Sequence, residues 1–381
     1  MMVDTPPRDA SAPVPPPPPG PPPRRPHRAR RIVLTLAALF GLLVVGAVIV
    51  IALVVHHLNT PATVPASWRP PAALPRSAEV AVAPGNLVFD SNRTGNYEIW
   101  TMGPDGTGAR QLTKDARYDS WWARLSPDRR TILFYRTPKG THDKDYASTS
   151  LWAMGADGSQ PVELRPAGLD GWVLQGHAEW SPDGTQLVMF GGNRSRPQIQ
   201  LTDTLGQHPH AITDRGGSNV DPSWSPDGRT IVFVGCPGSF CTPSSHEIYT
   251  VPAAGGQVTR LTHDGIEDND PYFSHDGTQL AWLSKVSGNL LSVGVWDIRI
   301  MPVTQEGNQV VAASTAAPRR LVDDRNINSK PAWSLDDHTI YFHRAVAGLT
   351  HGFQVWAIGV DGTGLHELTT GQGGSNEYPG T

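Results

Sequence analysis

The chain has 381 residues, a formal net charge of −4, and 39 glycines and 36 prolines. So much Gly and Pro indicates many turns and few long helices. Six arginines and two aspartates give residues 1–56 a charge of about +4, which leaves about −8 for the remainder. Nothing in that acidic remainder forms the Lys/Arg stripe that neutralises phosphates, so nucleic acid is excluded as a partner.

Residues 1–31 form a basic, proline-rich tail on the cytoplasmic side of the segment that follows. Its five consecutive prolines, Pro15 to Pro19, favour an extended polyproline II conformation over a packed core. We expect the tail to be disordered and to act as a spacer. The alternative is a ligand for a module with an aromatic groove.

Residues 32–55 are an uninterrupted apolar run without a charge. As a helix, these residues would cover roughly 36 Å, enough to cross a bilayer core. A basic cluster, Arg24 to Arg31, lies directly before the run and none follows it, which predicts a single pass through the inner (cytoplasmic) membrane, with the N-terminus in the cytoplasm. A cleaved signal peptide is the alternative, but the apolar core is longer than usual. The Pro/Ala-rich residues 56–85 are expected to form an outer stalk.

From residue 86 onward the chain repeats a unit of four short strands. The unit is clearest at Asp221 to Gly228, where Ser-Pro-Asp-Gly is typical of a type I turn between the first two strands. The following strands alternate apolar and polar residues. Spacings of 44 to 60 residues between successive turn serines suit the blades of a β-propeller. The turn serines are Ser126, Ser181, Ser225, Ser274 and Ser334.

The two ends of residues 86–381 are expected to complete a sixth blade. The segment opens at Asn86 to Phe89, which matches the second strand of the unit, and Asn376 to Thr381 matches the first. Pairing between these segments closes the ring and removes a free sheet edge. The sequence therefore predicts an all-β, six-bladed propeller of four-stranded blades.

One residue of each repeat is predicted to lie at the opening of the central channel. It stands directly before the proline position of the innermost strand, and the six side chains are aromatic, acidic and basic rather than uniformly small. We expect a ring that binds a peptide segment or a glycan, although solvated strand residues are an equal alternative. Its members are Trp122, His177, Asp221, Asp270, Lys330 and Tyr378. The Trp and Phe two positions after each proline are expected to be core between blades.

Cys236 and Cys241 are predicted to form a disulfide within one loop, because two cysteines around a short Gly/Pro stretch in an oxidising compartment favour local pairing. No metal or other cofactor is expected. His208-Pro209-His210 lies in a predicted loop, and Asp268-Asn269-Asp270 lacks the Gly and distal Glu of a helix-loop-helix calcium site.

The repeats around Trp224-Ser225-Pro226-Asp227-Gly228 resemble those of the TolB family, the periplasmic six-bladed propellers of bacterial envelopes. The chain departs from that family in having an apolar segment and stalk where TolB has an α/β domain. The resemblance implies a non-enzymatic scaffold that binds an envelope protein or a cell-wall ligand. The alternative is an envelope lyase or hydrolase that uses His177 with Asp221 or Asp270 as acid and base.

Overall fold

The computed structural model describes residues 58–381, except 215, 237, 239–240, 288–293, 307–308, 314–316, 323–325 and 346–351, together with Gly20 and some residues from Phe40 to His56. The chain divides into two compact units, residues 1–57 and 58–381.

The described residues from Phe40 to His56 are helical. The predicted tail, residues 1–31, lies outside the described residues apart from Gly20, and much of the predicted membrane helix, 32–55, also lies outside them. Within the described part of the chain, no helix combines the length and the apolar character that crossing a membrane requires.

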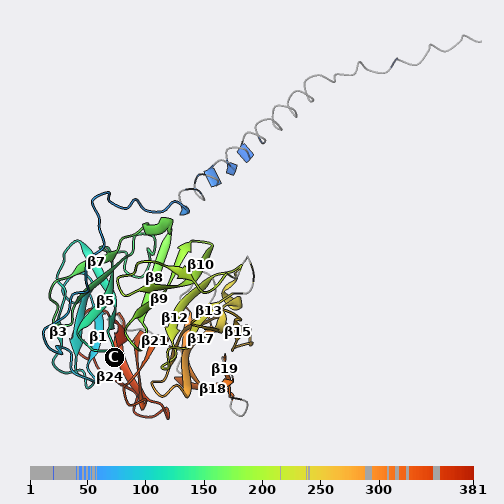
Figure 1. Ribbon diagram of the computed structural model, residues 1–381. Coiled ribbons are helices and arrows are strands. Elements are labelled where there is room, and N and C mark those ends of the chain that lie inside the picture. The colour runs from blue at the N-terminus through green and yellow to red at the C-terminus, as the bar shows by residue number, and fades with distance from the viewer. Residues whose placement is uncertain are drawn as a thin grey trace, which may run out of the picture. The chain divides into compact units, whose positions relative to one another are not determined.

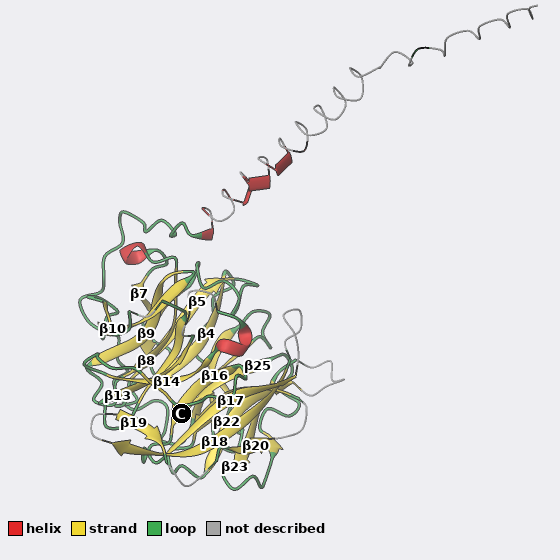
Figure 2. Cartoon of the chain, turned by 90° about the vertical axis from the view of Figure 1, so that its right-hand side faces the viewer, coloured by secondary structure: helices red, strands yellow, loops and turns green. Residues whose placement is uncertain are grey.

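Residues 58–381 form an all-β propeller, as predicted (Figures 1 and 2). Four sheets have four antiparallel strands each. In spatial order their strands are β25 (Asn376–Gly380), β1 (Leu87–Ser91), β2 (Glu98–Met102) and β3 (Arg110–Gln111); β4 (Tyr118–Leu125), β5 (Thr131–Pro138), β6 (Ser150–Gly155) and β7 (Val162–Arg165); β8 (Leu174–Trp180), β9 (Gln186–Asn193), β10 (Arg196–Asp203) and β11 (His210–Ala211); and β12 (Asn219–Trp224), β13 (Thr230–Gly235), β14 (Glu247–Pro252) and β15 (Thr259–Arg260).

A fifth sheet has nine strands, and a single parallel contact between Trp296 and Ile327 joins its two antiparallel halves. Two short 3₁₀ helices, Leu169–Gly171 and Pro243–Ser245, lie in loops elsewhere. The strands of the fifth sheet are β16 (Asp268–Phe273), β17 (Gln279–Ser287), β18 (Val295–Glu306), β19 (Gln309–Ala312), β20 (Arg319–Val322), β21 (Ile327–Trp333), β22 (Thr339–Ala345), β23 (Gln354–Gly359) and β24 (His366–Glu367).

The predicted closure of the ring is present. β25 pairs with β1 through Asp90 with Glu377 and Ser91 with Asn376. The innermost strands also contact one another in a closed cycle, which runs β4, β8, β12, β16, β21, β25 and back to β4. Side chains of the residues nearest the propeller axis can therefore meet.

The core consists of apolar layers between neighbouring sheets. In one layer Val88 and Ile99 of the first sheet pack with Ile132 and Phe134 of the second. A comparable layer joins the last strands of the chain to the first sheet, where Val355 packs with Phe89. Alternate residues of each strand therefore face a neighbouring sheet, as the period-two pattern predicts.

Part of the segment expected to be a stalk instead packs along the second sheet. The Thr131 hydroxyl donates to the Pro75 carbonyl at 2.8 Å, and the Ser77 amide donates to the Arg130 carbonyl at 2.9 Å. Val82 is buried in the layer between the first and second sheets. A Pro/Ala-rich segment without its own strand partners can bind in this way, because its carbonyls accept hydrogen bonds from the sheet. Residues 74–83 therefore belong to the propeller surface.

Candidate functional site

Each innermost strand has a β-bulge in which two residues are skipped by the strand pairing. In β12, for example, pairing jumps from Val220 to Ser223. The first skipped residue has a positive φ, between 50° and 57°, in all six strands. This left-handed conformation is costly for residues other than glycine, so surrounding contacts must hold it in place. The six residues are those predicted to form the ring: Trp122, His177, Asp221, Asp270, Lys330 and Tyr378.

The ring residues contact one another. The Trp122 and His177 rings stack, with centroids 3.7 Å apart and planes 3° from parallel. Lys330 Nζ lies 3.4 Å from the Trp122 ring centroid and forms an ion pair with Asp270. The ring of Tyr378 lies 5.4 Å from that of Trp122. Residues that are far apart in sequence thus form one compact layer across the axis.

The prediction that these residues line an open mouth is wrong, because the layer is buried. Trp122 is 1% exposed and Lys330 4%, and the Asp221 side chain, the most open of the six, is 12% exposed. Side chains that turn inward from six neighbouring strands meet at the axis and exclude water. Asp270 and Tyr378 also border a cavity beside the layer.

The loop between β5 and β6 also reaches the axis, which the sequence analysis missed. Tyr146 OH lies 2.9 Å from His177 Nε2, and Tyr378 OH donates to the Asp143 carboxylate. His142 Nε2 lies 2.8 Å from an oxygen of Asp90, a fully buried residue of β1. One loop therefore contacts two other sheets, the first and the third. The cluster of Tyr, His and Asp residues in this loop could have indicated its role. An alignment of the repeats compares only the strands and turns, so it did not include this loop.

Burial controls the charges in and near the layer. Burial and the nearby Lys330 ammonium hold the pKa of His177 well below its usual value, so its imidazole is neutral at pH 7. Burial raises the pKa of Asp221 and of Asp270, and the Lys330 ammonium opposes both rises. Burial also raises the pKa of Asp90 to about 7, against the opposing effect of its contact with His142.

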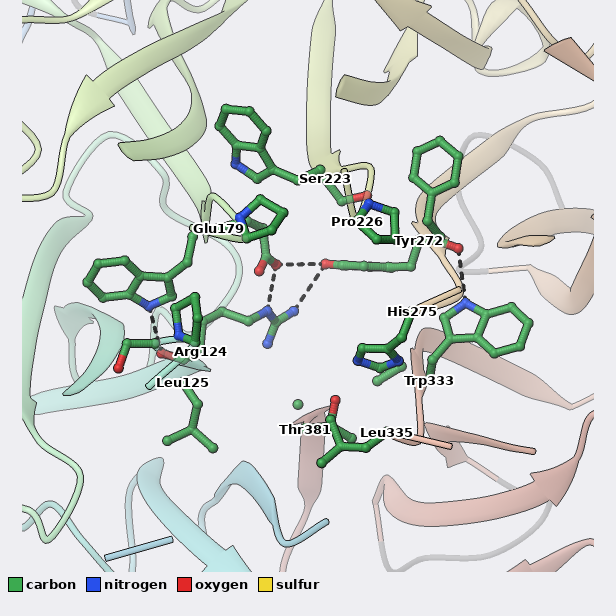
Figure 3. A pocket seen from close by; sticks show the side chains of 18 of the residues that line it. Arg124, Leu125, Glu179, Ser223, Pro226, Tyr272, His275, Trp333, Leu335 and Thr381 are labelled. Atoms are coloured by element: carbon green, nitrogen blue, oxygen red, sulfur yellow. Dashed lines mark hydrogen bonds and ion pairs between the residues drawn. The ribbon is translucent and has the colours of Figure 1, made fainter. Parts of the chain in front are cut away.

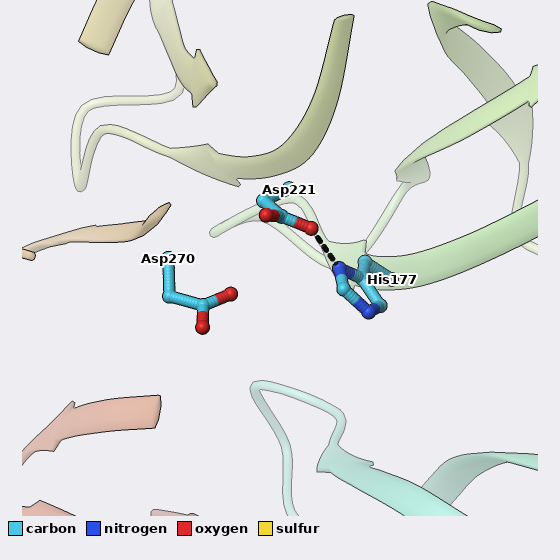
Figure 4. Close-up of side chains that lie close together, drawn as sticks. All are labelled: His177, Asp221 and Asp270. Atoms are coloured by element: carbon cyan, nitrogen blue, oxygen red, sulfur yellow. Dashed lines mark ion pairs between the residues drawn. The ribbon is translucent and has the colours of Figure 1, made fainter. Parts of the chain in front are cut away.

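His177, Asp221 and Asp270 each place one possible metal-ligand atom within 4.8 Å of the others. Figure 4 shows His177 against the Asp221 carboxylate, with the Asp270 carboxylate pointing toward that contact. Such a set suits a divalent metal. In the arrangement present, Lys330 beside Asp270 supplies the positive charge that a metal ion would bring.

Residues 173–301 match the family model described as "TolB beta propeller domain". Over these residues the propeller is TolB-like. A TolB homolog from Chlorobium luteolum is 26% identical over 204 residues, which are 54% of this chain and 32% of the homolog. The Tol-Pal system protein TolB of Francisella tularensis subsp. mediasiatica is 33% identical over 85 residues, 22% of this chain and 18% of that protein. The chain thus spans a third or less of the length of these relatives.

Solved TolB structures share the fold of this TolB-like propeller. TolB from Acinetobacter baumannii superposes with a TM-score of 0.59 at 17% identity, over 78% of this chain and 66% of that chain. A putative TolB from Agrobacterium tumefaciens gives a TM-score of 0.53 at 18% identity, over 74% of this chain and 87% of that chain. At such low identity the likeness describes architecture alone.

A pocket of about 520 Å³ lies in the TolB-like propeller on the side of the Ser-Pro-Asp-Gly turns (Figure 3). Three polar side chains from three strands meet in it. Arg124 Nε donates to Glu179 Oε1 at 2.5 Å, Arg124 also donates to the Tyr272 hydroxyl at 3.1 Å, and that hydroxyl donates to Glu179 at 3.0 Å. The Arg124 guanidinium lies 4.3 Å from the Trp122 ring centroid, so this turn-side pocket adjoins the buried layer.

The lining of the turn-side pocket is otherwise rich in aromatic, leucine and proline side chains. The tryptophans expected to be core contribute to it, and they also join neighbouring sheets. Trp180 Nε1 donates to the Arg124 carbonyl at 3.3 Å and Trp333 Nε1 to the Tyr272 carbonyl at 3.0 Å. The apolar and proline lining residues are Leu125, Pro127, Trp180, Pro182, Trp224, Pro226, Phe273, Trp333, Leu335 and Pro379.

A second cavity, of about 730 Å³, lies beside the β5–β6 loop. Its lining includes four carboxylates and one lysine, so the lining is acidic overall. Asp270 and Tyr378 separate it from the rest of the buried layer. The charged lining residues are Asp119, Asp143, Lys144, Asp270 and Glu377.

The predicted disulfide is present between Cys236 and Cys241, with Cα atoms 5.8 Å apart. It closes the loop between β13 and β14. The amide of Ser218, directly before β12, lies 3.4 Å from Cys241 Sγ. His208 lies in a loop, as predicted, and pairs with Asp203 at 2.9 Å. Neither feature contributes to the ring or to the turn-side pocket.

Proposed function

We propose that the protein is a non-enzymatic binding module of the bacterial cell envelope, built as a six-bladed TolB-like propeller on a membrane anchor. Two observations support six blades: the nine-stranded sheet can be counted as two, and six innermost strands contact one another in a closed cycle. Relatives named as Tol-Pal system proteins support an envelope protein as the ligand, with a cell-wall ligand as the other possibility.

The observation that carries this proposal is the turn-side pocket. Its centre holds a guanidinium, a carboxylate and a hydroxyl that are already paired, and aromatic, leucine and proline side chains surround them. An apolar rim of this kind suits a protein segment with aromatic or aliphatic anchors, and central polar groups fix its orientation. The predicted ring acts beneath this pocket as its support rather than as the contact surface.

Two features support a location outside the cytoplasm. The disulfide between Cys236 and Cys241 is typical of an oxidising compartment. The apolar run at 32–55, with arginines before it, agrees with an inner-membrane anchor whose N-terminus lies in the cytoplasm. On this proposal the proline-rich tail stays inside and the propeller outside.

The geometry favours binding over the lyase or hydrolase alternative. His177 lies in contact with Asp221, as an acid–base pair requires. Its ring, however, is stacked on Trp122 and its Nε2 is bonded to Tyr146 OH. A general base must reach a substrate proton, and this ring is buried with its Nε2 against Tyr146 OH.

The proposal is tested by cross-linking the full-length protein in intact membranes and identifying captured proteins by mass spectrometry. The informative variant is Leu335→Asp, because Leu335 lies in the turn-side pocket and is 42% exposed. We expect this variant to fold normally and to lose at least tenfold of the captured partner.

Leu365→Asp is the matched control, since Leu365 is similarly exposed, at 39%, and does not line that pocket. It is expected to capture the same partner as the native protein. Equal capture by both variants, or equal loss in both, contradicts a role for the turn-side pocket.

A further inference from the structure

The junctions between neighbouring sheets share a polar contact. At one junction, Gln198 Oε1 at the β10 side accepts from Thr213 Oγ1 at 2.8 Å and from Asn219 Nδ2 of the next sheet at 3.1 Å. At another, Gln354 accepts from Asn376 of the next sheet at 2.7 Å. In both cases an amide donates to an amide oxygen, so each buried acceptor is satisfied.

At the junction between β14 and β16, acids occupy both of these positions. Glu247 begins β14 and is 1% exposed, and Asp268 begins β16 and is fully buried. Glu247 Oε1 accepts from Arg260 at 2.5 Å, and Asp268 Oδ1 accepts from Trp282 Nε1 at 3.1 Å. Glu247 Oε2 and Asp268 Oδ2 have no hydrogen-bond partner among the described residues. Two buried carboxylates that face one junction are unfavourable unless a proton or cation joins them, because the neutral hydroxyls of Thr262 and Ser284 beside Asp268 leave the negative charge in place.

A third carboxylate and a hydroxyl complete the group. Asp264, in the loop from β15 to β16, places an oxygen within 4.8 Å of ligand atoms of Glu247 and Asp268. Its side chain is 38% exposed, which leaves a path from solvent. Ser284 is the strand partner of Asp268 and is fully buried, and its hydroxyl faces the Asp268 carboxyl. One ligand atom of each of the three acids thus lies within 4.8 Å of the others.

Two arginines reduce the negative charge without filling the gap. Arg260 binds the other oxygen of Glu247, and Arg299 donates to Asp264 Oδ2 at 2.9 Å. Three carboxylates and two guanidinium groups leave a charge of −1 when all are ionised. The adjacent Glu267 and Lys285 pair with each other at 2.7 Å and leave that charge unchanged.

We propose that Glu247, Asp264 and Asp268 bind a divalent cation of the oxygen-preferring class, such as Ca²⁺, which ties the fourth sheet to the fifth. Carboxylate and hydroxyl oxygens are the ligands that Ca²⁺ and Mg²⁺ prefer, and Ca²⁺ tolerates irregular geometry. The loop from β15 to β16 would then be an ion-stabilised link between sheets.

The test uses full-length protein freed of metal with a chelator and titrated with Tb³⁺ and then with Ca²⁺. Trp282 donates to Asp268, so a bound Tb³⁺ lies near an indole that can sensitise its luminescence. We expect tryptophan-excited Tb³⁺ emission that Ca²⁺ displaces, and a rise in Tm of about 5 °C at saturating Ca²⁺.

The decisive variant is Asp268→Asn, because it introduces the amide that Asn219 and Asn376 provide at two other junctions. It is expected to fold, to weaken Tb³⁺ binding at least tenfold, and to lose the Ca²⁺-dependent rise in Tm. Glu79→Gln removes one exposed charge elsewhere and should behave like the native protein. Undiminished Tb³⁺ and Ca²⁺ responses in Asp268→Asn overturn the proposal. So does a native protein whose Tm responds to pH and not to Ca²⁺, since the carboxyls would then share a proton.

Discussion

The outer turns and the central ring come from the same repeat, yet they differ in how their side chains vary. In each of the five turns a serine hydroxyl donates to an aspartate at 2.6 or 2.7 Å. The fourth turn residue has positive φ even where Arg129 or Asp337 replaces glycine. In the ring the backbone is equally uniform, but five different residue types occupy its six positions.

Turn residues are the same in every repeat and ring residues are not, because the two positions have different kinds of neighbours. A turn is satisfied by its own residues, so every copy needs the same serine and aspartate. A ring residue is satisfied by residues of other repeats, so Lys330 needs Asp270 while Trp122 needs His177. Hydrogen bonds within a turn require the same residues in every repeat. Contacts at the axis instead join complementary side chains, which therefore differ between repeats.

The largest effect that this comparison predicts is on Lys330. Lys330→Met keeps an unbranched side chain but leaves the buried Asp270 carboxylate without its cation. Removing one partner of a buried pair costs about 3–5 kcal/mol, so we expect the free energy of unfolding in denaturant to fall by that amount. The double variant Asp270→Asn with Lys330→Met should recover at least half of the loss. A double variant no more stable than Lys330→Met alone would show that the pair is not coupled.

A second, pH-dependent effect is expected for Asp90, which couples the β5–β6 loop to the first sheet. Its folded-state pKa of about 7 is above the ordinary value of 3.8, and the pKa of the bonded His142 is also raised. Both shifts mean that the folded state holds more protons than the unfolded state. The contribution of the pair is therefore complete at low pH and is lost as pH rises through about 7.

The measurement is the difference in unfolding free energy between the native protein and Asp90→Asn from pH 4 to pH 8. We expect this difference to decline by up to about 1.4 kcal/mol per unit as the pH rises from about 4 to about 7, and to level off above that range. Other titrating histidines, such as His177, are present in both proteins and cancel. A difference that stays constant with pH would rule out a proton held at Asp90.

The smallest effect is expected at a turn. Ser225 donates to Asp227 at 2.6 Å and accepts from the Thr230 amide at 2.9 Å, within one repeat. Ser225→Ala should lower the free energy of unfolding by about 1–2 kcal/mol, the usual cost of one lost buried hydrogen-bond partner. Denaturant unfolding beside Lys330→Met measures the contrast. Equal losses in the two variants would remove the distinction between locally satisfied turns and the mutually dependent ring.

Much of the fold was predictable because the repeat is local. The turn serines, the alternating strands and the match of Asn376 to the first strand led to the propeller, its closure and the disulfide. The six ring positions also followed from the alignment of the repeats. Their burial did not follow from the alignment. The residues around each ring position read as ordinary strand, and they give no sign of the left-handed conformation that turns the ring side chain toward the axis.

The sequence by itself determined the blade: strand order, turn chemistry and the position of each inward residue depend on neighbours within about 50 residues of chain. Only the tertiary structure decided what those inward residues do. The Lys330–Asp270 pair, the Trp122–His177 stack and the reach of Tyr146 to the axis join residues of different repeats. Such pairings depend on how the blades are arranged around a common axis. A repeat pattern in the sequence does not indicate which residues of different blades will meet at that axis.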